Sequence, residues 1–363
     1  MSLSIGIVGL PNVGKSSLFN ALTHAGVAVA SYPFTTIDPH HGVVSVPDPR
    51  IQAIASVTHP NRTVPATVEF VDIAGLVRGA HRGEGLGNQF LAHIREVDAI
   101  AHVVRCFPAP DIPHVEADMD PIRDIEIVET ELALADLVAV ERELERARTR
   151  SKAHDERAAS DLALLETVAE QLRRGVGVRR LSSDPRLTVL LRPLRLLTAK
   201  PVLYVANVAD GDLPAGASAD GVRHHAGVQD AGVVVLSAKL EAEATDLPAE
   251  DAAEFLRAFG LEEPGLQRLI RAAYKRLGLV TFFTTASREV RAWPVPQGTK
   301  APEAAGRIHT DMERGFIRAE VVPWEVLMAA GSIQAARDRG LVRLEGKEYL
   351  VQDGDVILFR FAV

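Results

Sequence analysis

Eight residues close to the N-terminus constrain the fold of this chain more than any other stretch. Residues 9–16 read Gly-Leu-Pro-Asn-Val-Gly-Lys-Ser, which fits the phosphate-loop pattern G-x-x-x-x-G-K-[ST]. A largely apolar, strand-like run precedes them at 3–8, and a helix-like run follows at 17–22. Strand, glycine loop and helix in this order aim backbone N–H groups and a helix N-terminus at a phosphate. The sequence therefore predicts a P-loop that binds a nucleoside triphosphate together with Mg²⁺.

The P-loop residues have separate predicted roles. Lys15 is the expected catalytic lysine, because the lysine of this pattern reaches the β- and γ-phosphates. The Ser16 hydroxyl is an expected ligand of Mg²⁺. The residues predicted to bind the nucleotide from this loop are Asn12, Val13, Gly14, Lys15, Ser16 and Ser17. A chance glycine-rich turn is the alternative, and the flanking strand and helix argue against it.

A second segment fits the metal side of the same site. Residues 69–75 read as a strand that ends in Asp-x-x-Gly, with Asp72 and Gly75 at the two fixed positions. Asp72 is expected to hold Mg²⁺, and the Gly75 N–H to bond the γ-phosphate and release it after hydrolysis. The pattern recurs by chance when it stands alone, but at a strand end downstream of a P-loop it is specific.

The loop at 32–39 lies between these two segments. Thr36 suits the switch threonine that coordinates Mg²⁺ when the γ-phosphate is present, and Thr35 is its close rival. An ordinary loop bounded by Pro33 and Pro39 is the alternative interpretation.

A third segment is predicted to read the base. Residues 207–210 read Asn-Val-Ala-Asp at the end of an apolar strand, where GTP-binding relatives usually have Asn-Lys-x-Asp. Val208 replaces the lysine that covers the base, while Asp210 keeps a carboxylate in the fourth place. Ser237 and Ala238 follow a later strand, as the supporting loop of such sites does. The predicted base-side residues are Asn207, Val208, Asp210, Ser237 and Ala238.

Strand and helix patterns predict how the chain is organised. Strand-like runs at 43–46, 67–71 and 99–104 alternate with helical segments, which predicts a doubly wound, mainly parallel α/β sheet. Helical periodicity follows at 124–148 and 162–172, and buried-strand signals return at 201–206 and 233–236. An antiparallel helical hairpin is therefore predicted as an insertion in the nucleotide-binding domain. The expected domains are 1–122 with 198–278, the hairpin at 123–197, and a C-terminal domain at 279–363.

The C-terminal segment has a different texture. Strands are predicted at 280–284, 289–295, 316–321 and 355–361, helices at 302–309 and 324–330, and a turn within 342–351. These elements fit a small mixed sheet wrapped on a helix.

Composition limits the compartment and the partners. Cys106 is the single cysteine of the 363 residues, so a reducing compartment is expected. No apolar run is long enough for a membrane span and no signal peptide is apparent, which predicts a cytoplasmic protein with no membrane partner. The net charge of −8 argues against unspecific nucleic-acid binding. The segment 173–200, however, contains eight basic residues and a single acidic one, Asp184. The basic residues are Arg173, Arg174, Arg179, Arg180, Arg186, Arg192, Arg195 and Lys200. This patch is either a solvated face or a surface for rRNA phosphates.

Together these motifs resemble the YchF/Obg-like ATPase family over essentially the whole chain. The most specific stretch is 72–88, which is similar to the glycine-rich second switch of that family; 9–22 and 120–126 also match. Residues 290–293, 315–321 and 351–356 resemble its C-terminal TGS module, a β-grasp fold, and the hairpin resembles its coiled-coil domain. The resemblance implies a cytoplasmic ATPase that also uses GTP and associates with the ribosome, through its large subunit. A monomer is the default expectation.

The resemblance leaves the choice of base open. The family usually carries Glu where this chain has Asp210, and an aspartate is the residue type that pairs with guanine. A site that hydrogen-bonds one base edge can reject another by about 10⁴-fold. The missing lysine at Val208 points towards the relaxed pocket of the family, so ATP is expected before GTP.

Hydrolysis is predicted to be slow. Many relatives have Gln directly after Asp-x-x-Gly to orient the attacking water, whereas this chain has Leu76. His114, in a loop after the strand at 99–104, is the hypothesised water-positioning residue, and a surface histidine is the alternative. Two other functions compete with a ribosome-associated NTPase. A small-substrate P-loop kinase is disfavoured by the Asp72 segment and the insertion, while Leu76 keeps a scaffold with a structural nucleotide open.

Overall fold

The computed structural model describes residues 3–24, 40–76, 79–80, 86–109, 118–151, 156–181, 185–286 and 288–362. Contacts within the chain divide it into two units. The first unit comprises Met1–Val43 and Glu69–Ala273, and the second comprises Val44–Val68 and Tyr274–Val363. Each unit has its own sheet.

The first unit is built on a six-stranded sheet whose order is β2-β4-β1-β5-β6-β7. Its strands are β1 (Ser4–Val8), β2 (His40–Ser45), β4 (Thr67–Asp72), β5 (Ala99–Cys106), β6 (Val202–Val208) and β7 (Gly232–Leu236). All paired strands from β4 to β7 run parallel. Every residue of β5 and β6 is buried, as expected for central strands covered by helices on both faces. The predicted doubly wound α/β class is confirmed.

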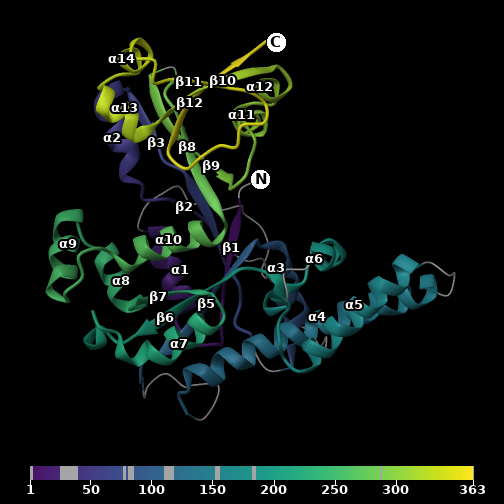
Figure 1. Cartoon of the computed structure of the whole chain (residues 1–363). Coiled ribbons are helices and arrows are strands. Elements are labelled where there is room, and N and C mark those ends of the chain that lie inside the picture. The colour runs from purple at the N-terminus through teal and green to yellow at the C-terminus, as the bar shows by residue number, and fades with distance from the viewer. Residues whose placement is uncertain are drawn as a thin grey trace. The chain divides into compact units, whose positions relative to one another are not determined.

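The helices of this unit connect the strands (Figure 1). They are α1 (Lys15–His24), α3 (Leu86–Glu96), α4 (Pro121–Ser151), α5 (Glu156–Arg173), α6 (Pro185–Leu191), α7 (Asp220–Val228), α8 (Ala238–Thr245), α9 (Ala249–Ala258) and α10 (Gly265–Arg276), the last of which ends in the second unit. No helix among the described residues is both long and apolar enough to cross a bilayer.

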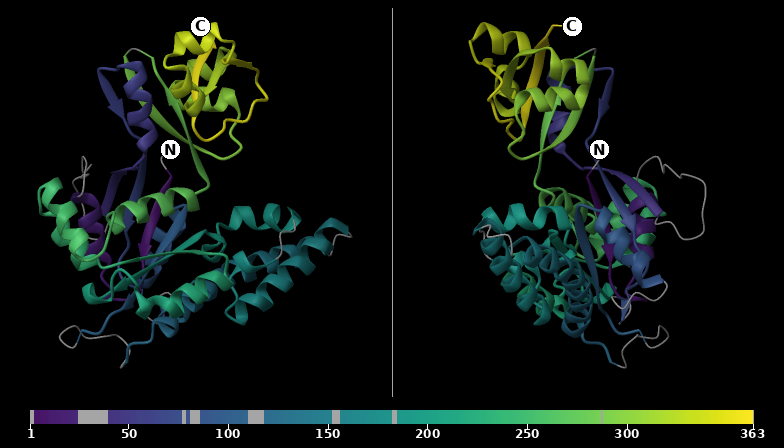
Figure 2. Two further views of the ribbon diagram at one scale, coloured as in Figure 1. Left: turned by 60° about the vertical axis from the view of Figure 1, so that its left-hand side comes forward. Right: turned by 90° about the vertical axis from the view of Figure 1, so that its right-hand side faces the viewer.

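The predicted hairpin is present as α4 and α5, inserted between β5 and β6. Figure 1 and the left view of Figure 2 show the two helices side by side, extending away from the sheet. They share an apolar core to which α4 contributes Val140 and Leu144, and α5 contributes Leu165 and Leu172. Asp136 on α4 is fully buried and accepts hydrogen bonds from the backbone N–H groups of residues 197 and 198, each at 2.8 Å.

The second unit contains a mixed sheet in the order β11-β10-β12-β8-β9-β3. Its strands are β3 (Arg62–Val64), β8 (Leu279–Thr284), β9 (Glu289–Pro296), β10 (Phe316–Pro323), β11 (Arg343–Glu345) and β12 (Asp355–Phe361). Its helices are α2 (Pro49–Thr58), α11 (Ala301–Ile308), α12 (Thr310–Arg314), α13 (Trp324–Ala330) and α14 (Ile333–Asp338). The core residues of β8, β10 and β12 pack on alanines of α11, such as Ala304 and Ala305. This is the predicted small sheet wrapped on a helix.

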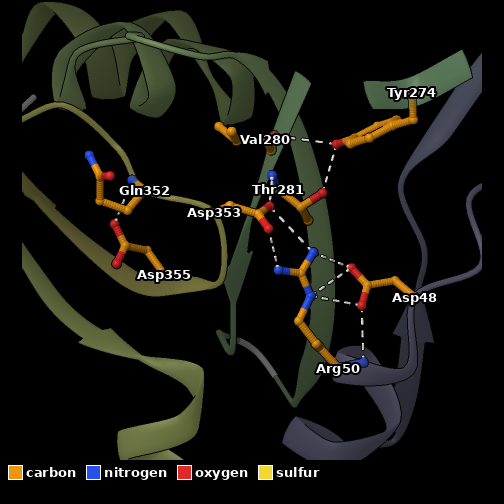
Figure 3. A network of polar contacts seen from close by, with 8 residues as sticks. All are labelled: Asp48, Arg50, Tyr274, Val280, Thr281, Gln352, Asp353 and Asp355. Atoms are coloured by element: carbon orange, nitrogen blue, oxygen red, sulfur yellow. Dashed lines mark hydrogen bonds and ion pairs between the residues drawn. The ribbon is translucent and has the colours of Figure 1, made fainter. Parts of the chain in front are cut away.

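The structure differs from the sequence-based boundaries at residues 44–68. The expected first domain included them, whereas their contacts lie in the second unit. Figure 3 shows one of the contacts that join these residues to the second unit: Arg50 of α2 binds both Asp48 and Asp353, and Asp353 also accepts the Thr281 N–H at 2.8 Å. The Arg50 guanidinium also lies 5.4 Å from the centre of the Phe283 ring. No local pattern signals these contacts, because they join residues far apart in the chain.

Candidate nucleotide-binding site

Parallel strand order places the predicted site residues at one edge of the first sheet. The P-loop follows β1, Asp72 ends β4, Asn207 lies near the end of β6, and Ser237 follows β7. Because the carboxyl ends of parallel strands meet at one edge, side chains far apart in sequence converge there. The topology alone therefore brings together the segments predicted to bind the phosphates, the metal and the base.

A cavity lies at this edge of the sheet. Sites for small molecules usually have a volume of about 300–1,000 Å³, and this cavity measures about 790 Å³. It is lined by most of the predicted nucleotide residues: Asn12, Gly14, Lys15, Ser16, Ser17, Asn207, Val208, Asp210, Ser237 and Ala238. Val13 is buried behind this wall. Gly75 lies beside the P-loop lysine, because a Cβ built on it would stand 3.2 Å from Lys15 Nζ.

Lys15 is the buried cation of the site. Its side chain is 7% exposed, and its Nζ donates to the Leu10 carbonyl at 2.7 Å. Burial lowers the pKa of Lys15 to about 8, although the charge of Asp72 opposes the shift. An ammonium held in this way has few water ligands to lose, so a phosphate oxygen is a favourable new partner.

Asn207 fastens the P-loop to the base-side loop. Its Nδ2 donates to the Val13 carbonyl and its Oδ1 accepts the Ala238 N–H, both at 2.9 Å. Gly14 allows this close approach, because a Cβ there would collide with the Asn207 amide, and its φ of +99° suits glycine. Asn207 is only 4% exposed, so both hydrogen bonds are shielded from water.

Two oxygen-bearing side chains are in contact on the side predicted to hold the metal. Ser16 Oγ donates to Asp72 Oδ2 at 3.1 Å. Burial raises the pKa of Asp72, although the hydrogen bond from Ser16 and the charges of Lys15 and His40 act to lower it. A hydroxyl beside a carboxylate fits Mg²⁺, which prefers oxygen ligands and completes its shell with water and substrate phosphates. Thr36 and its rival Thr35 lie outside the described residues.

Asp210 has partners on the base side. Its Oδ1 accepts from the Ser237 hydroxyl, and its Oδ2 accepts from Lys239 Nζ at 3.2 Å. The hydrogen bond to Asp210 raises the pKa of Lys239, and the Asp210 charge adds to the effect. Val208, at the usual lysine position, is buried, so no cation covers the base position from there.

Sequence reasoning missed an aromatic wall of the cavity. Phe107 follows β5 and lines the cavity together with Ala109. Arg105 holds it there: its Nε donates to the Phe107 carbonyl at 3.1 Å, its Nη2 to the Ala109 carbonyl at 3.0 Å, and its guanidinium lies 4.8 Å from the ring centre. No motif marks this pair. Three more lining residues on α8 or just after it, Ala242, Glu243 and Asp246, were also not predicted.

Of the two residues considered for hydrolysis, the structure describes Leu76 but not His114. Leu76 is 1% exposed and its N–H donates to the Gly9 carbonyl at 3.1 Å, so its side chain lies in the interior behind the P-loop. His114 lies outside the described residues.

Several basic side chains between 173 and 200 already have partners within the chain. Arg173 pairs with Glu141 and Arg174 with Glu170, while Lys200 donates to the Arg95 carbonyl at 3.1 Å. Arg179 donates to the Thr198 carbonyl at 3.0 Å. Three arginines of the patch, Arg180, Arg192 and Arg195, are exposed and carry no ion pair within the described ranges. The sequence count therefore overstated the charge available to a partner.

Two family models match separate parts of this chain. Residues 4–142 match the family model described as 50S ribosome-binding GTPase. Residues 279–362 match the C-terminal family model of YchF GTPases, described as a protein of unknown function.

Full-length relatives are similar to this chain. "Ribosome-binding ATPase YchF" of Bacillus subtilis (strain 168) is 50% identical over 366 residues, and the alignment covers 100% of both chains. The protein of the same name from Escherichia coli O157:H7 is 49% identical over 363 residues, again with 100% of each covered. The solved structure of the Schizosaccharomyces pombe YchF GTPase superposes with a TM-score of 0.87 at 36% identity, covering 99% of this chain and 98% of that one. The two bacterial relatives are named as ATPases, whereas the S. pombe protein is named as a GTPase.

Proposed function

This chain belongs to the YchF family, and on that premise we propose that it is a Mg²⁺-dependent NTPase that hydrolyses ATP slowly and associates with ribosomes. One observation carries the proposal. The P-loop and the Asn207–Asp210 segment line one cavity at the carboxyl edge of the sheet, and Ser16 of that lining contacts Asp72. A triphosphate, its metal and its base each have matching chemistry there.

In the proposed mechanism the protein binds and positions the triphosphate. The Lys15 ammonium and the N–H groups at the start of α1 bind the phosphate oxygens. Ser16, Asp72 and Thr36 would hold Mg²⁺, which neutralises charge on the β- and γ-phosphates when bound. The Gly75 N–H bonds the γ-phosphate. Phosphoryl transfer depends on this positioning and charge stabilisation more than on covalent chemistry.

Water activation is the weak step of this site. Leu76 has no polar group and is buried, which supports slow intrinsic turnover. His114 is proposed as the residue that positions the attacking water. The His114→Ala variant should retain nucleotide affinity and lose turnover, measured under single-turnover conditions. Unchanged turnover in that variant would reject the role.

ATP is proposed as the preferred substrate. Both oxygens of Asp210 already accept from Ser237 and Lys239, which supports a carboxylate less available to the N1–H and N2–H groups of guanine. Val208 supplies no cation above the base, and Phe107 offers a flat apolar contact that any purine satisfies. GTP is then a second, weaker substrate. Titration of a fluorescent ATP analogue, with unlabelled ATP and GTP as competitors, tests this order. GTP that competed about a hundredfold better would overturn it.

Ribosome association is the proposed purpose of the cycle. The relatives are named for ribosome binding, and the exposed Arg180, Arg192 and Arg195 support contact with rRNA phosphates of the large subunit. The proposal places the chain in the cytoplasm, as a monomer. Co-sedimentation with ribosomal subunits in the presence of ATP, GTP or no nucleotide tests it, and co-sedimentation with neither subunit in all three states would reject it.

Leu76 also favours a second candidate, a scaffold whose nucleotide is structural. This alternative predicts tight binding with negligible turnover even when ribosomes are present. Turnover that rises several-fold on addition of ribosomes would exclude it.

A further inference from the structure

A buried carboxylate of the hairpin reaches the second switch. Glu131 Oε1, on α4, accepts the backbone N–H of Gly79 at 2.7 Å. Glu131 is 5% exposed, and the hydrogen bond is partly buried. Hydrogen bonds to an ionised acceptor are among the stronger ones in proteins. The contact joins two segments that are 52 residues apart in the chain.

The position of Gly79 makes this contact relevant to the phosphates. Gly79 lies four residues after Gly75, which stands beside Lys15 at the γ-phosphate end of the P-loop. Leu76 is fixed by its hydrogen bond to the Gly9 carbonyl. The hydrogen bond at Gly79 adds a second restraint, three residues further along the chain, to the segment that begins at Gly75.

Gly79 itself is suited to a fixed, unusual backbone. Its φ is +86°, a conformation that L side chains rarely adopt, while the space around it is open. Glycine is therefore required here by conformation and not by crowding. The next residue, Ala80, is packed against Gly87, since a Cβ on Gly87 would approach the Ala80 Cα to 2.8 Å. The segment is held from two sides.

Glu131, the acceptor of this hydrogen bond, lies on α4 just before the part of the helix that packs against α5. The hairpin core shared with α5 begins at Ala133, two residues after Glu131. Before it, Ile125 and Val128 are buried, and α4 also packs on β5 and α7 of the first unit. Glu131 thus links the second switch to a continuous helix at the point where that helix leaves the sheet.

Building on the proposed hydrolysis of nucleotide, we propose that Glu131 is a positioning residue for that reaction. By accepting the Gly79 N–H, it acts together with the Leu76–Gly9 hydrogen bond to restrain the backbone that follows Gly75, and so limits where the Gly75 N–H points. It touches neither nucleotide nor metal. Its loss therefore reduces the rate of the chemical step and leaves nucleotide affinity nearly unchanged.

Two variants of Glu131 and one matched control test this role. In Glu131→Ala the acceptor is removed, and the single-turnover rate is expected to fall about 10- to 100-fold, the range of one hydrogen bond to a charged group. Glu131→Gln keeps a side-chain carbonyl for the same N–H, so most of the rate is restored. Glu129→Ala is the control, because Glu129 is on the same helix and accepts from Tyr204 at 2.7 Å instead of from the switch. Its rate is expected to stay near that of the unaltered chain.

Affinity and amide exchange complete the design. Nucleotide affinity of Glu131→Ala, from titration of a fluorescent ATP analogue, should change less than about threefold. Hydrogen exchange of the Gly79 amide should be slow in the unaltered chain and in Glu131→Gln, and fast in Glu131→Ala. Equal rate losses at Glu129 and Glu131, no rescue by Gln, or an affinity loss as large as the rate loss would overturn the proposal. If the unaltered chain binds ATP but hydrolyses none, the proposed function fails, and unchanged Gly79 exchange in Glu131→Ala would separately reject the positioning contact.

Discussion

Arg50 and Asp353, 303 positions apart in the chain, form a two-pronged ion pair in the second unit. Arg50 Nη1 donates to Asp353 Oδ2 at 2.7 Å, and Nη2 donates to Oδ1 at 3.3 Å. The same guanidinium binds Asp48, the N-cap residue of α2, through Nε at 2.9 Å and Nη2 at 2.7 Å. One arginine thereby attaches α2 to the turn that precedes the last strand, β12.

Arg50→Ala should destabilise the second unit by about 1–3 kcal/mol, because two carboxylates lose a partly buried partner. Arg50→Lys keeps the charge and loses the planar fork, so it should recover only part of this. Both tryptophans, Trp293 and Trp324, lie in the second unit, and their fluorescence in urea reports its unfolding. A double-mutant cycle with Asp353→Asn should show coupling of about 1 kcal/mol, since Asp353 is half exposed. Additive losses would contradict the ion pair.

Asn207→Ala should weaken ATP and GTP by the same factor, about 10- to 100-fold. Its amide bonds the Val13 carbonyl and the Ala238 N–H, so its removal loosens the cavity wall for any purine. Asp210→Asn is the contrasting variant, expected to change the ATP-to-GTP ratio. Titrations with fluorescent analogues of both nucleotides measure both effects. Unequal losses in Asn207→Ala would show that its main role is to read the base.

Leu76→Gln should not create an efficient GTPase-like site. The side chain at this position is buried and its backbone is fixed to Gly9, so a glutamine amide there would lie in the apolar interior. We expect a loss of about 1–3 kcal/mol in stability and no gain in single-turnover rate. A faster rate would mean that the segment turns outward when nucleotide is bound.

His102 should make the first unit less stable in acid. Burial lowers its pKa from 6.5 to about 4, helped by the charges of Arg179, His225 and Lys15 and opposed by Glu129. Between these two pH values the unfolded chain binds a proton that the folded chain excludes, so stability falls as the pH drops through this window and is fully present above pH 6.5. The slope is at most about 1.4 kcal/mol per pH unit.

The measurement for His102 is proton uptake on unfolding at about pH 5, inside this window, from calorimetry in buffers of different ionisation enthalpy. His102→Gln should take up about one proton fewer than the unaltered chain. An unchanged uptake would mean that His102 is charged in the folded state.

Charge reversal at Arg192 and Arg195 should reduce ribosome co-sedimentation more than reversal at Arg173 and Arg174, because the latter pair already neutralise Glu141 and Glu170. The first double variant should also show a flatter dependence of binding on salt, by about one unit of slope for each phosphate that is no longer neutralised. Equal effects of the two double variants would place the ribosome-binding surface elsewhere.

Local patterns were sufficient for the strands and for the fold class. The apolar runs that became β5 and β6, and the C-terminal strands β8, β9, β10 and β12, were predicted within a few residues, because burial on one or both faces leaves a direct mark on the sequence. The short strand β11 was not predicted. The P-loop and Asp72 were assigned to one site by their motifs and their order in the chain. The roles of individual site residues stay predictions.

Distant contacts left no such mark. The Arg105–Phe107 arrangement, the hydrogen bond from Gly79 to Glu131 and the attachment of α2 through Arg50 each depend on segments that meet only in the folded chain. The basic patch shows the opposite error: eight positive residues were counted, but the acids that neutralise Arg173 and Arg174 lie on the helices themselves. A linear count of charge cannot include such partners.

The pairing of β3 with β9 also bears on how the polypeptide matures. β3 ends at Val64, whereas β9 begins at Glu289. At the usual speed of translation, about 5–20 residues per second, the later strand leaves the ribosome on the order of 10–50 s after the earlier one. Throughout that interval the nascent chain carries α2 and β3 without β9, the strand that pairs with β3. We therefore expect the first unit, which contains the P-loop and ends at Ala273, to fold before the second.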